Sequence, residues 1–79
     1  MRSMDVVAER ALDLIAQRDW DAIRDVVHPY LHWTRSDGSV LRGRTTLIAA
    51  IEAGDLVPLP PERIELRDGQ IYRWTEPAA

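Results

Sequence analysis

The stretch His28–Thr46, HPYLHWTRSDGSVLRGRTT, decides the fold of this chain. Pro29 biases its neighbour away from helical dihedrals, so a preceding helix must stop there. The aromatic-rich segment Tyr30–Arg35 alternates as a strand requires. Asp37-Gly38 is a strong turn signal, and Val40–Arg42 can return as an antiparallel partner. The stretch therefore predicts the end of one helix, a hairpin and the start of another helix.

Two helices are predicted before this stretch and one at its end. The spacing of apolar residues predicts the first over residues 4–17, with Ser3 as its N-cap, and Asp19 is expected to cap the second. Thr45 is the predicted N-cap of the third helix, and Gly54 suits the left-handed position after its end. The residues expected to face the core are Met4, Ala8, Ala11, Leu12, Ile15, Trp20, Ile23, Val26, Val27, Leu47, Ile48 and Ile51.

A second hairpin is predicted near the C-terminus. Asp68-Gly69 lies between two strand-like segments, residues 62–67 and 70–75, and a two-residue turn fixes their register. The expected pairs are Leu66 with Ile71, Glu65 with Tyr72, Ile64 with Arg73 and Arg63 with Trp74. Residues 76–79 are expected to form a loose tail. The order α-α-β-β-α-β-β predicts a single α+β domain over residues 1–79, with helices on one side of a curved, mostly antiparallel sheet.

Composition excludes several classes of function. The formal net charge is −3, the 10 basic residues are interspersed with 13 acids, and cysteine is absent. A nucleic-acid surface would need a basic stripe, and no apolar run is long enough for a membrane span. Two histidines without cysteine offer too few ligands for a metal site, and no cofactor is expected. Acids within the first apolar segment argue against a signal peptide, so a cytoplasmic protein is expected.

The small size of the chain favours self-association. A chain of 79 residues buries only about 60% of its unfolded surface. Without a disulfide or a metal, oligomerisation is the remaining common way to supplement such a core. A short sheet also leaves bare strand edges, which template association. We therefore expect a homodimer, formed through exposed sheet edges or through a sheet face.

An ordered set of short segments is shared with a known superfamily. In chain order the segments are Asp19–Ile23, His28-Pro29-Tyr30, His32-Trp33, Asp37-Gly38, Leu41–Arg44 and Ile48–Ile51. Together they resemble the SnoaL-like branch of the nuclear transport factor 2-like superfamily. The resemblance implies a cystatin-like cone of helices and sheet. Family domains are usually longer, so the resemblance implies a shortened cone here, with a shallow or open pocket.

The resemblance leaves the question of enzymatic activity open. Ketosteroid isomerase-like members place a general-base carboxylate on the first strand, where this chain has Thr34 and Arg35. His32 could replace it as a base, with Tyr30 polarising a substrate oxygen from the same strand face. The plainer interpretation of His32 is a half-buried strand residue. Asp37 is the nearest carboxylate to the missing base, but an Asp in a turn usually bonds its own backbone.

Other residues are candidates for ligand binding or proton transfer. Trp33, Tyr72 and Trp74 could line an apolar pocket for a flat or cyclic ligand, or they could be core or dimer anchors. Arg42 and Arg44, with the helix start at Thr45-Thr46, could hold an anion, or the two arginines could simply be solvated or paired with Asp residues. Glu65 opposite Tyr72 could be desolvated and act as an acid–base group, or it could be an exposed polar pair.

Two functions follow from these observations. The first is a homodimeric interaction module or small-ligand-binding module, with a small apolar or anionic ligand. The second is a SnoaL-like isomerase, cyclase or dehydratase that acts on a small apolar cyclic substrate, with His32 and Tyr30 or Glu65 as acid–base groups. An enclosed cavity where Tyr30, His32, Tyr72 and Trp74 converge would favour the enzyme or a binding pocket. A filled interior, with Trp33 or Trp74 packed across a twofold axis, would favour the interaction module.

Overall fold

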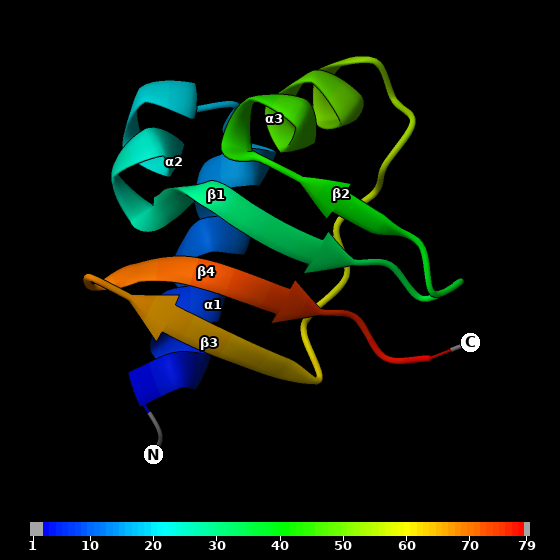
Figure 1. Cartoon of the computed structure of the whole chain (residues 1–79). Coiled ribbons are helices and arrows are strands. Elements are labelled where there is room, and N and C mark those ends of the chain that lie inside the picture. Colours follow the sequence, from blue (N-terminus) through cyan, green and yellow to red (C-terminus); the bar gives the residue numbers. More distant parts are fainter. Residues whose placement is uncertain (1–2, 79) are drawn as a thin grey trace.

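The computed structural model describes residues 3–78, which form three helices and four strands (Figure 1). In chain order the elements are α1 (Ser3–Ala16), α2 (Trp20–Val26), β1 (Val27–Thr34), β2 (Val40–Arg42), α3 (Arg44–Glu52), β3 (Arg63–Arg67) and β4 (Gln70–Thr75). This is the predicted order, and the chain is an α+β protein. None of the described helices is both long and apolar enough to cross a membrane.

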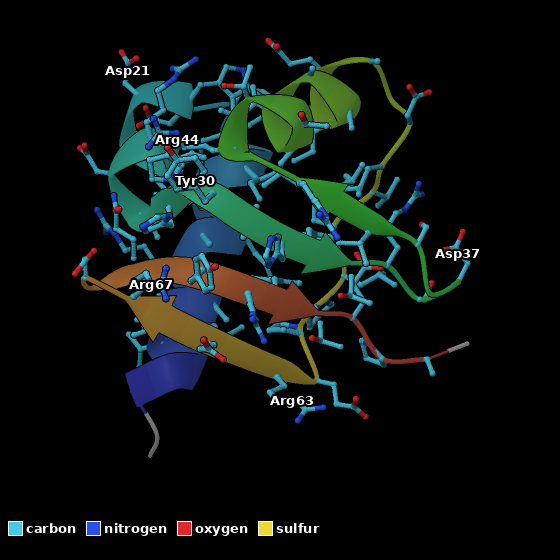
Figure 2. All side chains as sticks on the ribbon, in the orientation of Figure 1. Asp21, Tyr30, Asp37, Arg44, Arg63 and Arg67 are labelled. Carbon is cyan, nitrogen blue, oxygen red and sulfur yellow. The ribbon has the colours of Figure 1, made fainter. Side chains whose placement is uncertain are left out.

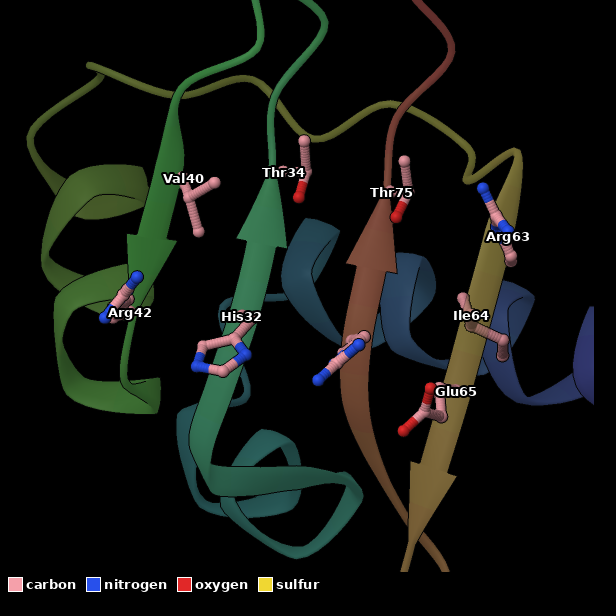
Figure 3. Close-up of a pocket in the computed structure, with 9 residues that line it drawn as sticks. His32, Thr34, Val40, Arg42, Arg63, Ile64, Glu65 and Thr75 are labelled. Carbon is pink, nitrogen blue, oxygen red and sulfur yellow. The ribbon is translucent and has the colours of Figure 1, made fainter.

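The strands form one open, mixed sheet in the order β2-β1-β4-β3. Both hairpins are antiparallel as predicted, whereas the two central strands, β1 and β4, run parallel. That parallel pairing joins the two halves of the chain. Figure 3 views the sheet from one face and shows the helices behind it. The other face, toward the viewer, is the uncovered face of the sheet.

Apolar side chains fill the space between the helices and the sheet. Trp33 of β1 and Trp74 of β4 are neighbours across the parallel ladder, and their rings stack with centroids 4.4 Å apart at an interplanar angle of 8°. Every predicted core position from Ala8 onward is buried or packs partly buried against the core. Besides Trp33 and Trp74, the buried apolar residues are Ala8, Ala11, Leu14, Ile15, Ile23, Val27, Leu31, Leu47, Ile48, Ile51, Leu56, Ile64 and Ile71.

Two of the predicted helix boundaries are confirmed by their hydrogen bonds. The Asp19 side chain accepts a hydrogen bond from the Ala22 backbone N–H at 3.2 Å, which caps α2. Gly54 follows α3 with φ 79° and donates its N–H to the Ile51 carbonyl at 3.1 Å. The side chain of Ser3, the predicted N-cap of the first helix, lies outside the part of the chain that the structure describes.

Two other boundaries differ from the prediction. β1 begins at Val27, directly after α2, rather than at Tyr30. Val27 already has extended dihedrals, φ −110° and ψ 132°, so the chain turns from helix to strand without a loop. Gly43, rather than Thr45, precedes α3 as its N-cap. Its φ of 96° is a conformation that glycine adopts without steric cost.

A bulge makes the pairing of β3 with β4 differ from the predicted register. Asp68-Gly69 forms the predicted tight turn, with φ 54° and 78°. The observed pairs are Leu66 with Ile71, Glu65 with Arg73, Ile64 with Trp74 and Arg63 with Thr75. They replace the predicted Glu65–Tyr72, Ile64–Arg73 and Arg63–Trp74 pairs. Tyr72 is the extra residue, and without it strand alternation would send Ile71 and Trp74 to opposite faces. The bulge lets both enter the core.

Candidate functional site

The two tryptophans predicted to line a pocket lie in the core. Trp33 is 1% exposed and Trp74 is 0% exposed. Their polar edges are also satisfied internally. The Trp33 indole N–H donates to Glu76 Oε2 at 3.0 Å, and the Trp74 indole N–H donates to the Leu59 carbonyl at 3.2 Å. Neither ring therefore offers a surface to a ligand in this structure.

Glu76 is the buried polar residue that the sequence did not single out. It is 5% exposed, and its carboxylate accepts hydrogen bonds from Trp33, from the Ser36 backbone N–H at 3.0 Å and from the Leu59 backbone N–H at 3.4 Å. The predicted loose tail is therefore wrong at this residue. A buried indole N–H requires an acceptor, but no local pattern indicates which carboxylate supplies it.

Aromatic and cationic side chains gather on the uncovered face around Tyr72. The His28 ring meets Tyr72 edge-on at a centroid distance of 5.2 Å, and His32 lies 5.4 Å away. The Arg67 guanidinium stacks 4.4 Å from the Tyr72 centroid, and that of Arg73 lies at 5.6 Å. Cation–π attraction holds such arginines in place. The bulge in β4 thus creates an ordered cluster of rings and charges.

Tyr30 lies on the same face, at the edge of this cluster (Figure 2). It is 73% exposed, and its ring centroid is 5.7 Å from that of His28. The Tyr30 backbone N–H donates to His28 Nδ1 at 3.0 Å. His28 itself is 9% exposed. This bond ties the His28 ring to the backbone of β1 beside Tyr30.

A shallow groove of about 410 Å³ crosses the uncovered face (Figure 3). Its floor comes from the central strands β1 and β4, and its sides come from β2 and β3. The lining residues are His32, Thr34, Val40, Arg42, Arg63, Ile64, Glu65, Arg73 and Thr75. We call this cleft the sheet groove.

The ladder arranges the sheet-groove residues in two rows across the strands. The first row, the histidine row, runs Arg42, His32, Arg73, Glu65, and the second, the threonine row, runs Val40, Thr34, Thr75, Arg63. Directly opposite residues share a face, and adjacent strands are about 4.8 Å apart. The side chains within each row are therefore neighbours.

The predicted acid–base groups are not assembled around an enclosed cavity. His32 and Glu65 share the histidine row, but Arg73 lies between them. Within residues 3–78, no hydrogen bond joins His32 to a carboxylate. Tyr30 is largely exposed and lies beside His28 rather than in the groove lining. These residues thus share a surface but do not form a catalytic pair.

The predicted anion site at the start of α3 is divided between two places. Arg44 turns toward α2, where Nη1 donates to the Arg24 carbonyl at 2.8 Å and to the Val27 carbonyl at 3.3 Å (Figure 2). An arginine there satisfies carbonyls that the end of a helix leaves without partners. Gln70 adds a bond to the Arg24 carbonyl. Arg42, by contrast, faces the sheet groove.

Asp37 serves the turn, as the plainer interpretation predicted. Its Oδ1 accepts hydrogen bonds from the Ser39 backbone N–H at 2.9 Å and from the Ser39 hydroxyl at 2.6 Å. The hydroxyl bond, followed by the backbone bond, lowers the pKa of Asp37 below its ordinary 3.8. Its oxygen is therefore occupied in ordering the turn.

Comparisons with known proteins found no match for this chain among family models, curated proteins or solved structures. Among the side chains that the structure describes, those of residues 6–78, no three of His, Asp or Glu come together in a way that could hold a metal ion.

Proposed function

We propose that this protein is a homodimeric interaction module with a shortened nuclear transport factor 2-like fold of the SnoaL-like type. The filled interior carries this proposal. The Trp33–Trp74 stack occupies the space between helices and sheet, and both indole N–H groups are bonded inside the protein. Recognition then takes place on the surface rather than in an enclosed pocket. The predicted order of elements, with the helices behind an open sheet, supports the shortened cone.

The outer edge of β3 is the surface that best fits a second copy. In the described sheet, β3 is bonded to β4 on one side only. Its outward backbone N–H and C=O groups are a template for another strand. Leu66 lies on this edge and is 39% exposed, although its side chain is apolar. A second β3 strand would cover both the backbone and this side chain.

Charge and the exposed Leu66 together favour one register for this pairing. An axis through Ile64 would also oppose unlike charges, Arg63 and the partner's Glu65, but it would centre on a buried side chain. If the twofold axis passes through Leu66, the two copies of Leu66 meet, and Glu65 lies opposite the partner's Arg67 on each side of the axis. Opposite charges on directly facing residues are favourable. An axis through Glu65 would instead oppose Glu65 to itself and Arg63 to the partner's Arg67. Like charges destabilise such pairs, so we propose the register centred on Leu66.

Sedimentation velocity at micromolar concentration tests the dimer and its register. We expect the mass of a dimer for the natural chain, and dissociation for Glu65→Arg, because that substitution opposes two arginines. The double variant Glu65→Arg with Arg67→Glu restores the opposite pairing and should restore the dimer. Asp13→Arg changes charge on an exposed position of α1 and is the matched control. A monomeric natural chain, or a double variant that stays monomeric, would refute the proposal.

A further inference from the structure

The sheet groove adjoins the proposed dimer contact and shares Glu65 with it, and its charge is distinctive. Arg42, Arg63 and Arg73 line it, and Glu65 is the one carboxylate among its lining residues. Yet the whole chain has a formal net charge of −3. The uncovered face is therefore basic on an acidic protein. A local concentration of one sign of charge attracts ligands of the opposite sign.

The arginines of the groove have spare capacity for hydrogen bonds. Among residues 6–78, whose side chains the structure describes, the ion pair found is Arg24 with Asp21, on α2, and none involves Arg42, Arg63 or Arg73. The described side-chain hydrogen bonds do not use these three guanidinium groups either. Each guanidinium carries five N–H donors. Neighbouring cations repel one another, and a bound anion would relieve that repulsion.

Further hydrogen-bonding groups lie between the arginines. In the histidine row, His32 stands between Arg42 and Arg73. In the next row, Thr34 and Thr75 face each other across the two central strands. Hydroxyl groups donate to an anion without adding charge. The groove therefore offers cationic donors on two sides and neutral donors along its floor (Figure 3).

We propose that the sheet groove binds the phosphate group of a small, hydroxyl-bearing phosphate ester. Arg42 of β2 and Arg73 of β4 hold the phosphate from the two strands that flank β1, while Thr34 and Thr75 donate from the central strands. A tetrahedral dianion presents oxygens in several directions and so matches donors from several strands, whereas a planar carboxylate presents only two oxygens. Glu65, at the end of the histidine row, can accept a hydrogen bond from a ligand hydroxyl.

The size of the groove agrees with such a ligand. Its volume of about 410 Å³ lies within the range of small-molecule sites. A phosphate group fills only part of that space, and the rest can accept a short polyhydroxylated carbon chain. The inference goes beyond the proposed interaction role, because it concerns a small ligand on the face of the sheet, which meets the β3 edge at Glu65.

Titration with glycerol phosphate tests the site directly. ¹⁵N-resolved NMR spectra of the full chain, recorded at constant ionic strength, should show saturable shifts of the His32, Thr34, Arg73 and Thr75 amides. Inorganic phosphate should shift the same amides with weaker affinity, and glycerol should not. Shifts spread over α1 and α2, or succinate binding as tightly as glycerol phosphate, would overturn the proposal.

Substitutions separate a specific site from general charge attraction. Arg73→Gln and Arg42→Gln should each weaken glycerol phosphate binding by about tenfold, since a charge-assisted hydrogen bond is lost. Arg10→Gln removes the same charge from an exposed position on α1 and should leave the affinity within about twofold. Equal weakening by all three variants would overturn the proposal. Thermal melting checks that each variant is folded, and sedimentation checks that its oligomeric state is unchanged.

Discussion

At the scale of single residues, Glu76 shows how one carboxylate can hold three segments together. Its oxygens accept from the indole of Trp33, from the turn at Ser36 and from the connector at Leu59. Each donor is buried or partly buried, so each would lose its partner if the carboxylate were removed. An unsatisfied buried donor costs about 1–3 kcal/mol. Glu76, just after β4, is thus part of the folded unit.

We expect Glu76→Ala to lower the free energy of unfolding by about 3 kcal/mol, because the indole and two backbone N–H groups lose their acceptor. Urea denaturation followed by tryptophan fluorescence measures the change. Glu62→Ala is the matched control, because Glu62 is exposed, and its effect should stay within about 0.5 kcal/mol. Equal effects of the two variants would show that Glu76 does not hold these segments.

Asp37 supplies a prediction about pH. Because bonding to Ser39 lowers the pKa of Asp37 below 3.8, the folded state binds this proton less readily than the unfolded state. The stabilisation is therefore present above the ordinary pKa and is lost as pH falls through the lowered value. In Ser39→Ala, an NMR titration should show the pKa of Asp37 rising toward 3.8. Ser36→Ala should leave the pKa of Asp37 unchanged. If the pKa rose as much in Ser36→Ala as in Ser39→Ala, the bonds from Ser39 would not be the cause of the lowered value.

At the scale of secondary-structure elements, the bulge in β4 decides both faces of the sheet. It turns Ile71 and Trp74 into the core and leaves Tyr72 as the extra residue between Ile71 and Arg73. On the uncovered face, Tyr72 then receives His28 edge-on and Arg67 over its ring. One inserted residue therefore completes the core and orders the surface cluster.

We expect Tyr72→Ala to lower the free energy of unfolding by about 1–2 kcal/mol, because the aromatic and cation–π contacts are lost. Tyr72→Phe keeps the ring and should lie within about 0.5 kcal/mol of the natural chain. Thermal and urea denaturation measure both variants. If Tyr72→Phe were as destabilising as Tyr72→Ala, the lost stability would come from the hydroxyl group and not from the contacts of the ring.

At the scale of the whole molecule, two adjoining surfaces, which share Glu65, have different proposed roles. The helices cover one face of the sheet, the β3 edge fits a second copy, and the sheet groove on the other face fits an anion (Figures 1 and 3). In the proposed dimer, the two uncovered faces join into one longer basic surface. Self-association would then bring two ligand grooves side by side.

We expect Leu66→Asp to dissociate the dimer, because the proposed axis brings two copies of residue 66 together and would oppose two carboxylates there. Leu66 is 39% exposed, so the folded monomer should survive the change. Val57→Asp is the control, since Val57 is 76% exposed and lies in the connector before β3. Sedimentation velocity distinguishes the two variants, and a dimeric Leu66→Asp would argue against this interface.

The sequence by itself determined the features that depend on near neighbours. The order of elements, the Asp19 cap, the Asp68-Gly69 turn and the Asp37 turn follow from local dihedral preferences and from hydrogen bonds that span a few residues. The apolar faces of the helices follow in the same way, because the helical repeat alone sets which side chains share a face.

Only the tertiary structure decided how distant segments meet. The parallel pairing of β1 with β4, the bulge at Tyr72 and the burial of Glu76 each depend on contacts between the two halves of the chain. Strand alternation cannot indicate a bulge, because the extra residue is selected by the core that Ile71 and Trp74 must both reach. The rows of the sheet groove exist for the same reason, since their members come from four strands whose neighbours and register are fixed by packing.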